Sequence, residues 1–141
     1  MTRARSGSGR LVPEALLAAL QSNDQGLVPT VIQDAVSKRV LTLCYLNREA
    51  IIKSLTEGKV YVFRRSKNRL MLKGETSGHV QAITRVEVDC EGNSLLLMVR
   101  QRVAGCHAGY FSCYYRRLSS SGRLRITERR VFDPARVYRK S

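Results

Sequence analysis

Short β-type runs separated by tight turns fill the chain from Lys59 to Phe132, and this pattern restricts the fold more than any other feature. The runs "VYVFRR" and "RLMLK" flank "SKN", "HVQAITRVEVDC" and "SLLLMVRQ" flank "EGN", and "CYYRRL" and "RLRITERRVF" flank "SSSG". Strands joined by so few residues pair as antiparallel neighbours. In the third run, alternation predicts that Val80, Ala82, Val86 and Val88 point inward.

The first sixty residues add two helices and two further strands. Pro13 is suited to the first turn of a helix over 13–23, and Asn47 can cap a helix over 48–57 that ends at Gly58. The runs "LVPTVIQDA" and "RVLTLCYL" between them are β-rich. The sequence therefore predicts a β-rich α+β fold of antiparallel strands with two peripheral helices, in a single domain over 13–141.

Residues 1–12 are predicted to be a basic disordered tail. "MTRARSGSGR" holds three arginines and lacks the apolar centre of a secretory signal, and "LLLMV" is too short to span a bilayer. We therefore expect a cytoplasmic protein that does not contact a membrane. The net charge is +14, and residues 116–141 carry nine basic residues against two acidic ones. Such a bias favours anionic partners, although a solvated basic surface has the same composition.

Three cysteines and one histidine are candidates for a metal site. Cys90, Cys106 and Cys113 have the spacing C-x15-C-x6-C, which differs from the paired C-x2-C of zinc fingers. Catalytic zinc is commonly held by three protein ligands and a water molecule. His107 is a possible fourth ligand or a base beside the metal. Buried, inert cysteines are the alternative, and we interpret Cys44, inside an apolar run, as a core residue.

Two polar turns are candidates for ion and phosphate binding. Asp89, Glu91 and Asn93 surround the bend at Gly92, and their oxygen atoms suit a hard cation. The stretch "KGETSG" offers backbone amides and hydroxyls to a phosphate, although many ordinary loops have this composition. The predicted substrate-binding residues are Arg65, Ser66, Lys67, Lys73, Gly74, Glu75, Thr76, Ser77, Gly78 and Arg116.

Together these stretches resemble one enzyme family. "VLTLCYLNREAIIKSLTEGKVYVFRRS", "LKGETSGHVQ", "VDCEGNSLLLMV" and "CHAGYFSCYYR", with the ending "FDPARVY", closely resemble phosphoribosyl-AMP cyclohydrolase of histidine biosynthesis. The resemblance implies a zinc-dependent hydrolase that opens the adenine ring of N1-(5-phosphoribosyl)-AMP at the N1–C6 bond. It also implies an intertwined homodimer, in which each zinc site takes ligands from both chains. Cys90, Cys106 and Cys113 correspond to the zinc thiols of the family.

The resemblance also implies roles for His107 and for a magnesium loop. A zinc-bound hydroxide would attack C6, and His107 would accept the proton of that water and pass it to a ring nitrogen. The family's Mg2+ loop reads Asp-Cys-Asp-x-Asp, whereas here Glu91 and Asn93 replace the second and third aspartates. Because Asn93 loses a charge, we expect weaker Mg2+ binding than in the family.

Two alternatives follow from the same residues. A paralogue with Asn93 in the loop would bind nucleotide and turn it over poorly, although the three thiols and His107 favour activity. A basic, zinc-stabilised module that binds nucleic acid would explain the arginines. It would leave the acids around Cys90 unexplained, so we expect a small-molecule nucleotide as the ligand. The chain shows no pyrophosphohydrolase domain such as some relatives carry, and we expect that step on another chain.

Overall fold

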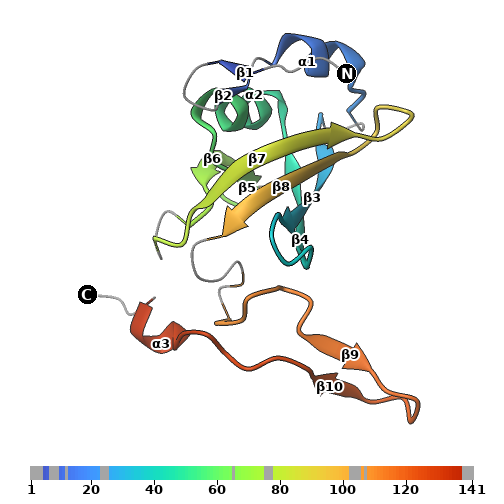
Figure 1. Cartoon of the computed structure of the whole chain (residues 1–141), viewed down its shortest axis with the longest axis vertical. Coiled ribbons are helices and arrows are strands. Elements are labelled where there is room, and N and C mark those ends of the chain that lie inside the picture. Colours follow the sequence, from blue (N-terminus) through green and yellow to red (C-terminus); the bar gives the residue numbers. More distant parts are fainter. Residues whose placement is uncertain are drawn as a thin grey trace.

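A four-stranded sheet forms the centre of the molecule in the computed structural model, which describes residues 5–6, 10–11, 13–22, 26–64, 66–74, 78–101, 106 and 108–137 (Figure 1). Its strands, in spatial order, are β4 (Val40–Leu46), β3 (Val28–Asp34), β8 (Leu95–Gln101) and β7 (Gln81–Val88). The chain reverses tightly between β3 and β4 and between β7 and β8, and both pairs are antiparallel. The β3–β4 pair and the β7–β8 hairpin thus form the two halves of the sheet.

The part of the chain that the structure describes contains three helices: α1 (Glu14–Ala19), α2 (Arg48–Glu57) and α3 (Pro134–Val137). The prediction for α2 is confirmed at both ends. The Asn47 side chain accepts a hydrogen bond from the N–H of Ala50 at 2.8 Å, and Gly58 closes the helix with φ 73°. Ala50, Ile51 and Leu55 are buried, so this helix packs one apolar face onto the sheet.

The hydrophobic core lies between α2 and the sheet. Ile32, Leu41, Leu46, Leu97 and Val99 are fully buried and belong to one cluster with the apolar face of α2. Leu16, Leu17 and Leu20 from α1 and the following residue pack against the same cluster. The core thus joins both predicted helices to the central sheet.

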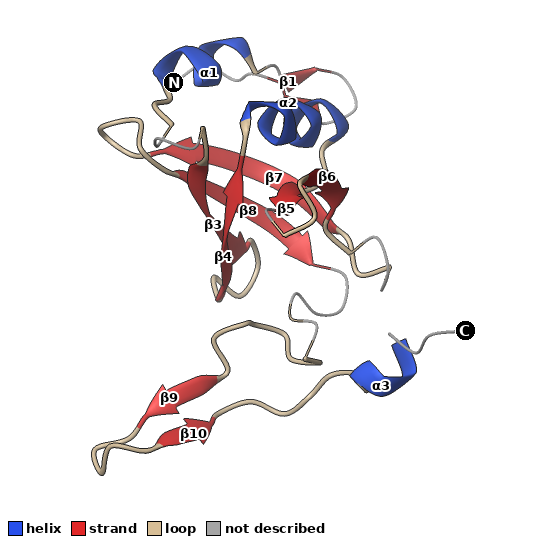
Figure 2. Cartoon of the chain, turned by 180° about the vertical axis from the view of Figure 1, so that it is seen from behind, coloured by secondary structure: helices blue, strands red, loops and turns tan. Residues whose placement is uncertain are grey.

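Among the described residues, three two-stranded pairs lie outside the sheet: β1 (Arg5–Ser6) with β2 (Arg10–Leu11), β5 (Tyr61–Arg64) with β6 (Arg69–Leu72), and β9 (Arg116–Leu118) with β10 (Leu124–Ile126). The last of these, residues 116–126, is called the C-terminal arm below. Figures 1 and 2 show that the arm extends away from the sheet and that α3 follows it. Strands therefore lie on either side of "SKN", "EGN" and "SSSG" as predicted, although β9 and β10 are much shorter than the predicted runs "CYYRRL" and "RLRITERRVF".

The topology differs from the sequence prediction in two respects. Strands β3 and β8 are parallel neighbours, with Ile32 opposite Leu97, whereas we expected antiparallel strands only. About sixty residues separate these strands, which is enough chain for the crossover that a parallel pair requires. The short helix α3 adds a third helix to the two that were predicted.

The inward face of β7 was also predicted incorrectly. Gln81 and Ile83 are buried, while Ala82 is exposed and Val88 is 38% exposed. The register between β7 and β8 shifts between Ile83 and Arg85, which indicates a β-bulge. The bulge changes the phase of the alternation, so Val86 packs against the core although Ala82 does not.

The predicted boundary between a tail and a domain stays a prediction. Of residues 1–12, the structure describes β1 and β2 only, as a short antiparallel pair. Among the helices of the described ranges, none combines the length and the apolar character that a membrane crossing requires.

Candidate metal centre

Two of the three predicted metal ligands, Cys106 and Cys113, come together. The two thiols lie near enough for each to affect the other electrostatically, and both lie on the irregular segment between β8 and β9. Cys106 is buried, at 6% exposure, and Cys113 is partly buried. We refer to this pair of thiols as the half-site.

A tight turn fixes Cys106. Its Sγ accepts the N–H of Ala108 at 3.4 Å, and its carbonyl accepts the N–H of Gly109 at 3.0 Å. The N–H of Cys106 donates to the carbonyl of Tyr110 at 3.2 Å, and the Tyr110 ring stacks on Tyr115 with centroids 3.8 Å apart. These bonds fix the position of the Cys106 sulfur, which is a soft donor of the kind that zinc binds.

The free edge of β4 fixes Cys113. The N–H of Cys113 donates to the carbonyl of Leu41 at 2.7 Å, and the Ser112 hydroxyl donates to the carbonyl of Val40 at 2.7 Å. Thr42, the next residue of β4, makes a side-chain hydrogen bond with the Cys113 thiol. A strand of the central sheet therefore sets where the second thiol lies.

Lys73 provides positive charge at the half-site. Burial raises the pKa of the Cys113 thiol above its ordinary value, and the Cys106 thiol adds to the rise. The Thr42 hydrogen bond and the charge of Lys73 act in the opposite direction. Lys73, predicted to bind substrate phosphate, follows β6, and its N–H donates to the carbonyl of Val60 at 2.9 Å.

The charges of Lys73 and Cys113 both act on the pKa of the Cys44 thiol, yet Cys44 is a core residue. Burial raises the pKa of its thiol to about 12, more than the charge of Lys73 lowers it. Its side chain packs against the hydrophobic cluster. A thiol with this pKa stays protonated at neutral pH, which agrees with the structural role expected for Cys44.

Cys90 lies apart from the half-site within one chain. It is exposed in the turn between β7 and β8, whereas Cys113 is bonded to β4 at the opposite edge of the sheet. The turn leads into β8, and β8 is separated from β4 by β3. With neighbouring strands about 4.8 Å apart, the turn and the β4 edge are therefore roughly 10 Å or more apart across the sheet. Sulfur ligands of one zinc ion lie only about 4 Å apart. Accordingly, within the described ranges no three His, Cys, Asp or Glu side chains of one chain form a metal-binding group.

The turn that carries Cys90 is closed by its own side chains. The Asp89 carboxylate accepts the N–H of Asn93 at 2.7 Å and the Ser94 hydroxyl at 3.2 Å, and the first of these bonds lowers the pKa of Asp89. The Asn93 amide donates to Glu91 at 3.1 Å. Asn93 thus acts as a donor within the turn. These bonds would have to rearrange before Asp89, Glu91 and Asn93 could all turn their oxygens toward a Mg2+ ion, which needs such ligands.

The turn also rests on the end of α1. The N–H of Gln21 donates to the carbonyl of Gly92 at 2.7 Å. A Cβ atom on Gly92, which has φ +72°, would lie 2.0 Å from the carbonyl oxygen of Ala19. Only glycine fits this close approach of two backbones. The predicted role of Gly92 in the bend is thus confirmed, and its neighbour is the amino-terminal helix.

The remaining predicted residues are divided between described and undescribed segments. Ser66 and Lys67 are exposed in the turn of the β5–β6 hairpin, and Arg116 is exposed at the base of the arm. Gly74 and Gly78 are joined by a hydrogen bond of 2.7 Å from the N–H of Gly78 to the carbonyl of Gly74. The predicted residues that lie outside the described ranges are Arg65, Glu75, Thr76, Ser77 and His107.

Sequence reasoning missed the residues that support the half-site. The cysteine segment is also bonded to β7 and β8. Gln81 of β7 donates to Gln101 of β8 at 2.6 Å, and Gln101 donates to the carbonyl of Phe111 at 2.8 Å. Gln81 is fully buried in β7, so this relay anchors the other side of the cysteine segment to the sheet. A glutamine at an inward-facing strand position is the signal that would have indicated a buried polar contact.

The donor set of the half-site fits a thiophilic cation such as zinc. Two neighbouring thiols supply soft sulfur donors, and the charge of Lys73 offsets part of the rise that burial causes in the pKa of Cys113. Two thiols fill two positions of a tetrahedral site. A complete zinc centre therefore needs ligands beyond the described side chains near the half-site.

Comparisons with known proteins identify similar chains. The family model described as phosphoribosyl-AMP cyclohydrolase matches residues 42–115. A phosphoribosyl-AMP cyclohydrolase of Pelotomaculum thermopropionicum is 43% identical over 88% of this chain and 96% of its own length. One of Chlorobium phaeovibrioides is 36% identical over 95% of this chain and 98% of its own length. The histidine biosynthesis bifunctional protein HisIE of Thermoanaerobacter pseudethanolicus is 44% identical over 89% of this chain, which spans 57% of that relative.

Proposed function

The chain belongs to the phosphoribosyl-AMP cyclohydrolase family of hydrolases, and we propose that it hydrolyses N1-(5-phosphoribosyl)-AMP in histidine biosynthesis. The reaction opens the adenine ring at N1–C6 and gives the phosphoribosylformimino aminoimidazole carboxamide ribotide. The observation that carries this proposal is that the Cys106 thiol and the Lys73 charge both act on Cys113, inside the segment that the family model matches. It supports a thiolate metal centre next to a cation that can bind phosphate.

The proposed zinc ligands are Cys106 and Cys113 of one chain and Cys90 of a second copy. The exposure of Cys90 and its distance from the half-site support this division, because a thiol at the surface is available to another chain. When bound, zinc supplies Lewis-acid activation of the water molecule that attacks C6 of the ring. The tight turn at Cys106 and the edge of β4 hold two ligands in place before the metal arrives.

The second copy is proposed to pack against the C-terminal arm. Leu118 and Leu124 are directly paired across the β9–β10 hairpin and lie on one face with Ile126. These three side chains are 60% to 68% exposed and share their face with Arg116, while Arg117 and Arg125 occupy the other face. A hairpin with an uncovered apolar face is the kind of surface that a homodimer buries. This supports the intertwined homodimer expected from the family.

Binding of the substrate is assigned to cations and backbone amides near the half-site. Lys73 is proposed to bind a phosphate through its ammonium group, and the glycine-containing sequence "KGETSG" is proposed to offer backbone amides to that phosphate. Ser66, Lys67 and Arg116 are exposed and accessible to the second phosphate. Arg65, Glu75, Thr76 and Ser77 complete the set by their place in the sequence.

His107 is proposed to accept the proton that the attacking water loses. It directly follows Cys106 in the sequence, and a histidine titrates in the range that such a transfer requires. The same imidazolium can return the proton to the ring nitrogen that leaves. No other residue within two positions of a proposed zinc thiol is a histidine.

Magnesium is expected to bind weakly to the turn at Cys90. Because the Asn93 amide donates to Glu91, and Asp89 holds the backbone of the turn, Mg2+ would have to break these bonds to bind. Titration calorimetry of the zinc-loaded protein should give a weak Mg2+ isotherm, and Asn93→Asp should strengthen it. A strong isotherm that Asp89→Ala abolishes would contradict the prediction.

Ring opening, followed by absorbance and combined with metal analysis, tests the proposed function. We expect purified protein to carry about one zinc per chain and to open the ring of N1-(5-phosphoribosyl)-AMP. His107→Ala should retain its zinc and lose turnover, since only the proton acceptor is removed. Zinc-loaded protein that leaves the substrate intact would contradict the proposal, as would full turnover by His107→Ala.

A further inference from the structure

Arg39 is held firmly at the turn between β3 and β4. The buried Asp34 carboxylate accepts the N–H of Ser37 at 2.7 Å and its hydroxyl at 2.8 Å. The N–H of Arg39 then donates to the Ser37 hydroxyl at 3.2 Å, and the carbonyl of Arg39 accepts the N–H of Asp34 at 2.8 Å. The base of the Arg39 side chain is therefore fixed by the central sheet.

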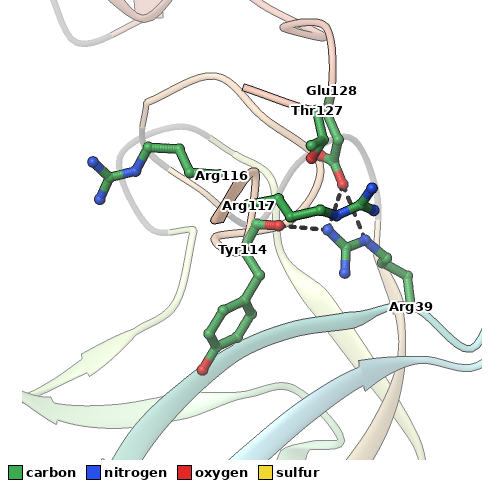
Figure 3. Close-up of a pocket in the computed structure, with 6 residues that line it drawn as sticks. All are labelled: Arg39, Tyr114, Arg116, Arg117, Thr127 and Glu128. Atoms are coloured by element: carbon green, nitrogen blue, oxygen red, sulfur yellow. Dashed lines mark hydrogen bonds and ion pairs between the residues drawn. The ribbon is translucent and has the colours of Figure 1, made fainter. Parts of the chain in front are cut away.

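The guanidinium of Arg39 joins two segments that are distant in sequence. Its Nε and Nη2 donate to Oε2 of Glu128 at 3.0 and 2.7 Å, and Nη2 also donates to the carbonyl of Tyr114 (Figure 3). Tyr114 precedes the C-terminal arm and Glu128 follows it. One side chain thus ties the segments before and after the arm to the turn between β3 and β4.

The bond to Tyr114 continues a row of contacts that includes a proposed zinc ligand. The carbonyls of Val40 and Leu41, the two residues after Arg39, accept bonds from Ser112 and Cys113, respectively. The N–H of Tyr114 in turn donates to the Ser112 hydroxyl at 2.9 Å. Arg39 and the first two residues of β4 therefore bind three consecutive residues, Ser112 to Tyr114, around the Cys113 thiol.

These contacts lie at a pocket of about 440 Å³ lined by Arg39, Tyr114, Arg116, Arg117, Thr127 and Glu128. In Figure 3 the Arg116 side chain points away from the Arg39–Glu128 pair, so the arginines of the pocket do not converge on one point. Arg117 lies on the same side as the pair and makes none of the three bonds of Arg39. The pocket is thus organised by one ion pair and its bond to the backbone.

We propose that Arg39 is a positioning residue for the metal centre, an inference that rests on the proposed function. It acts through Tyr114 and Glu128 to keep Cys113 at the distance from Cys106 that a shared zinc ion requires. Residues that orient metal ligands from outside the first layer typically change metal affinity about 10- to 100-fold when they are removed. The ion pair is partly exposed, at 38% and 21% of the two side chains, so its share in global stability is small.

Zinc affinity, measured by competition with a chromogenic chelator, tests the proposal. We expect Arg39→Ala to bind zinc about 10- to 100-fold more weakly than the unmodified protein. Arg117→Ala is the matched control, because it removes a guanidinium from the same pocket but none of the three bonds. Arg39→Lys should give an intermediate affinity, since an ammonium group cannot reproduce the planar set of donors.

Hydrogen exchange of the metal-free protein provides a second readout that does not depend on zinc. In Arg39→Ala the amides of Cys113 and Tyr114 should exchange faster, while those of β3 and β8 keep their protection and the urea midpoint is unchanged. Unchanged exchange together with unchanged zinc affinity would overturn the proposal, and so would an equal loss in Arg117→Ala. If the unmodified protein bound no zinc, the proposed function would be wrong, and the exchange result would still decide whether Arg39 holds Cys113.

Discussion

Cys106→Ser is expected to abolish zinc binding and to reduce ring opening by about a thousandfold or more. The variant removes one of the two thiols of the half-site and the sulfur that accepts the N–H of Ala108. A catalytic metal contributes several kcal/mol to the stabilisation of the transition state, and each 1.36 kcal/mol corresponds to about a factor of ten in rate. Metal content after dialysis and the absorbance change on ring opening measure both effects.

Cys44→Ser is the matched control for this experiment. Cys44 also lies near Lys73 and Cys113, but burial keeps its thiol protonated, with a pKa of about 12. We expect this variant to retain zinc and most of its activity, with a modest loss of stability from a polar group in the core. Equal losses of zinc in the two variants would contradict the assignment of Cys106 as a ligand.

Gly109→Ala is expected to weaken zinc binding about a hundredfold. Gly109 has φ +100°, and a Cβ atom on it would lie 2.5 Å from the carbonyl oxygen of Phe132 and 3.1 Å from Cδ of Pro134. Its own carbonyl accepts the N–H of Val131 at 2.7 Å. Backbone strain and overpacking of this kind together cost about 3 kcal/mol. If this cost destabilises the conformation of the cysteine turn that binds zinc, the zinc affinity falls about a hundredfold.

Gly122→Ala separates the cost of the left-handed backbone from the cost of the close contact with Phe132 and Pro134. Gly122 has φ +84° at the tip of the C-terminal arm, and a Cβ atom on it would meet nothing within 4 Å. This variant carries a similar backbone penalty without the contact to residues 132–134, so we expect zinc affinity within about threefold of the unmodified protein. Comparable losses in both glycine variants would show that the approach of Phe132 to the cysteine turn is irrelevant to the metal.

Local signals in the sequence predicted the secondary structure well. The Asn47 cap and the left-handed Gly58 mark the two ends of α2, and each signal involves only residues next to the end that it marks. Neighbouring residues therefore suffice to predict both ends. The same holds for the turns at "SKN", "EGN" and "SSSG". The inward face of β7 was not predictable in this way, because the bulge after Ile83 depends on pairing with β8.

Contacts distant in sequence account for what the sequence could not predict about the site. The resemblance identified Cys90, Cys106 and Cys113 as a group, but the order of strands in the sheet decides that only two of them meet within a chain. Arg39 and Glu128 are 89 residues apart, and neither belongs to a recognisable motif. Their pairing depends on the path of the chain after β8, which local patterns do not encode.

The division of the zinc ligands between two chains is tested most directly with mixed dimers. Cys90→Ser and Cys106→Ser, each inactive alone, are co-expressed with different affinity tags, and the dimer that carries both tags is isolated. In this dimer one site combines the intact Cys90 of one chain with the intact Cys106 and Cys113 of the other, so we expect about half of the unmodified zinc content and activity. A doubly tagged dimer without zinc or turnover, or a fully active Cys90→Ser homodimer, would contradict a metal centre shared between chains.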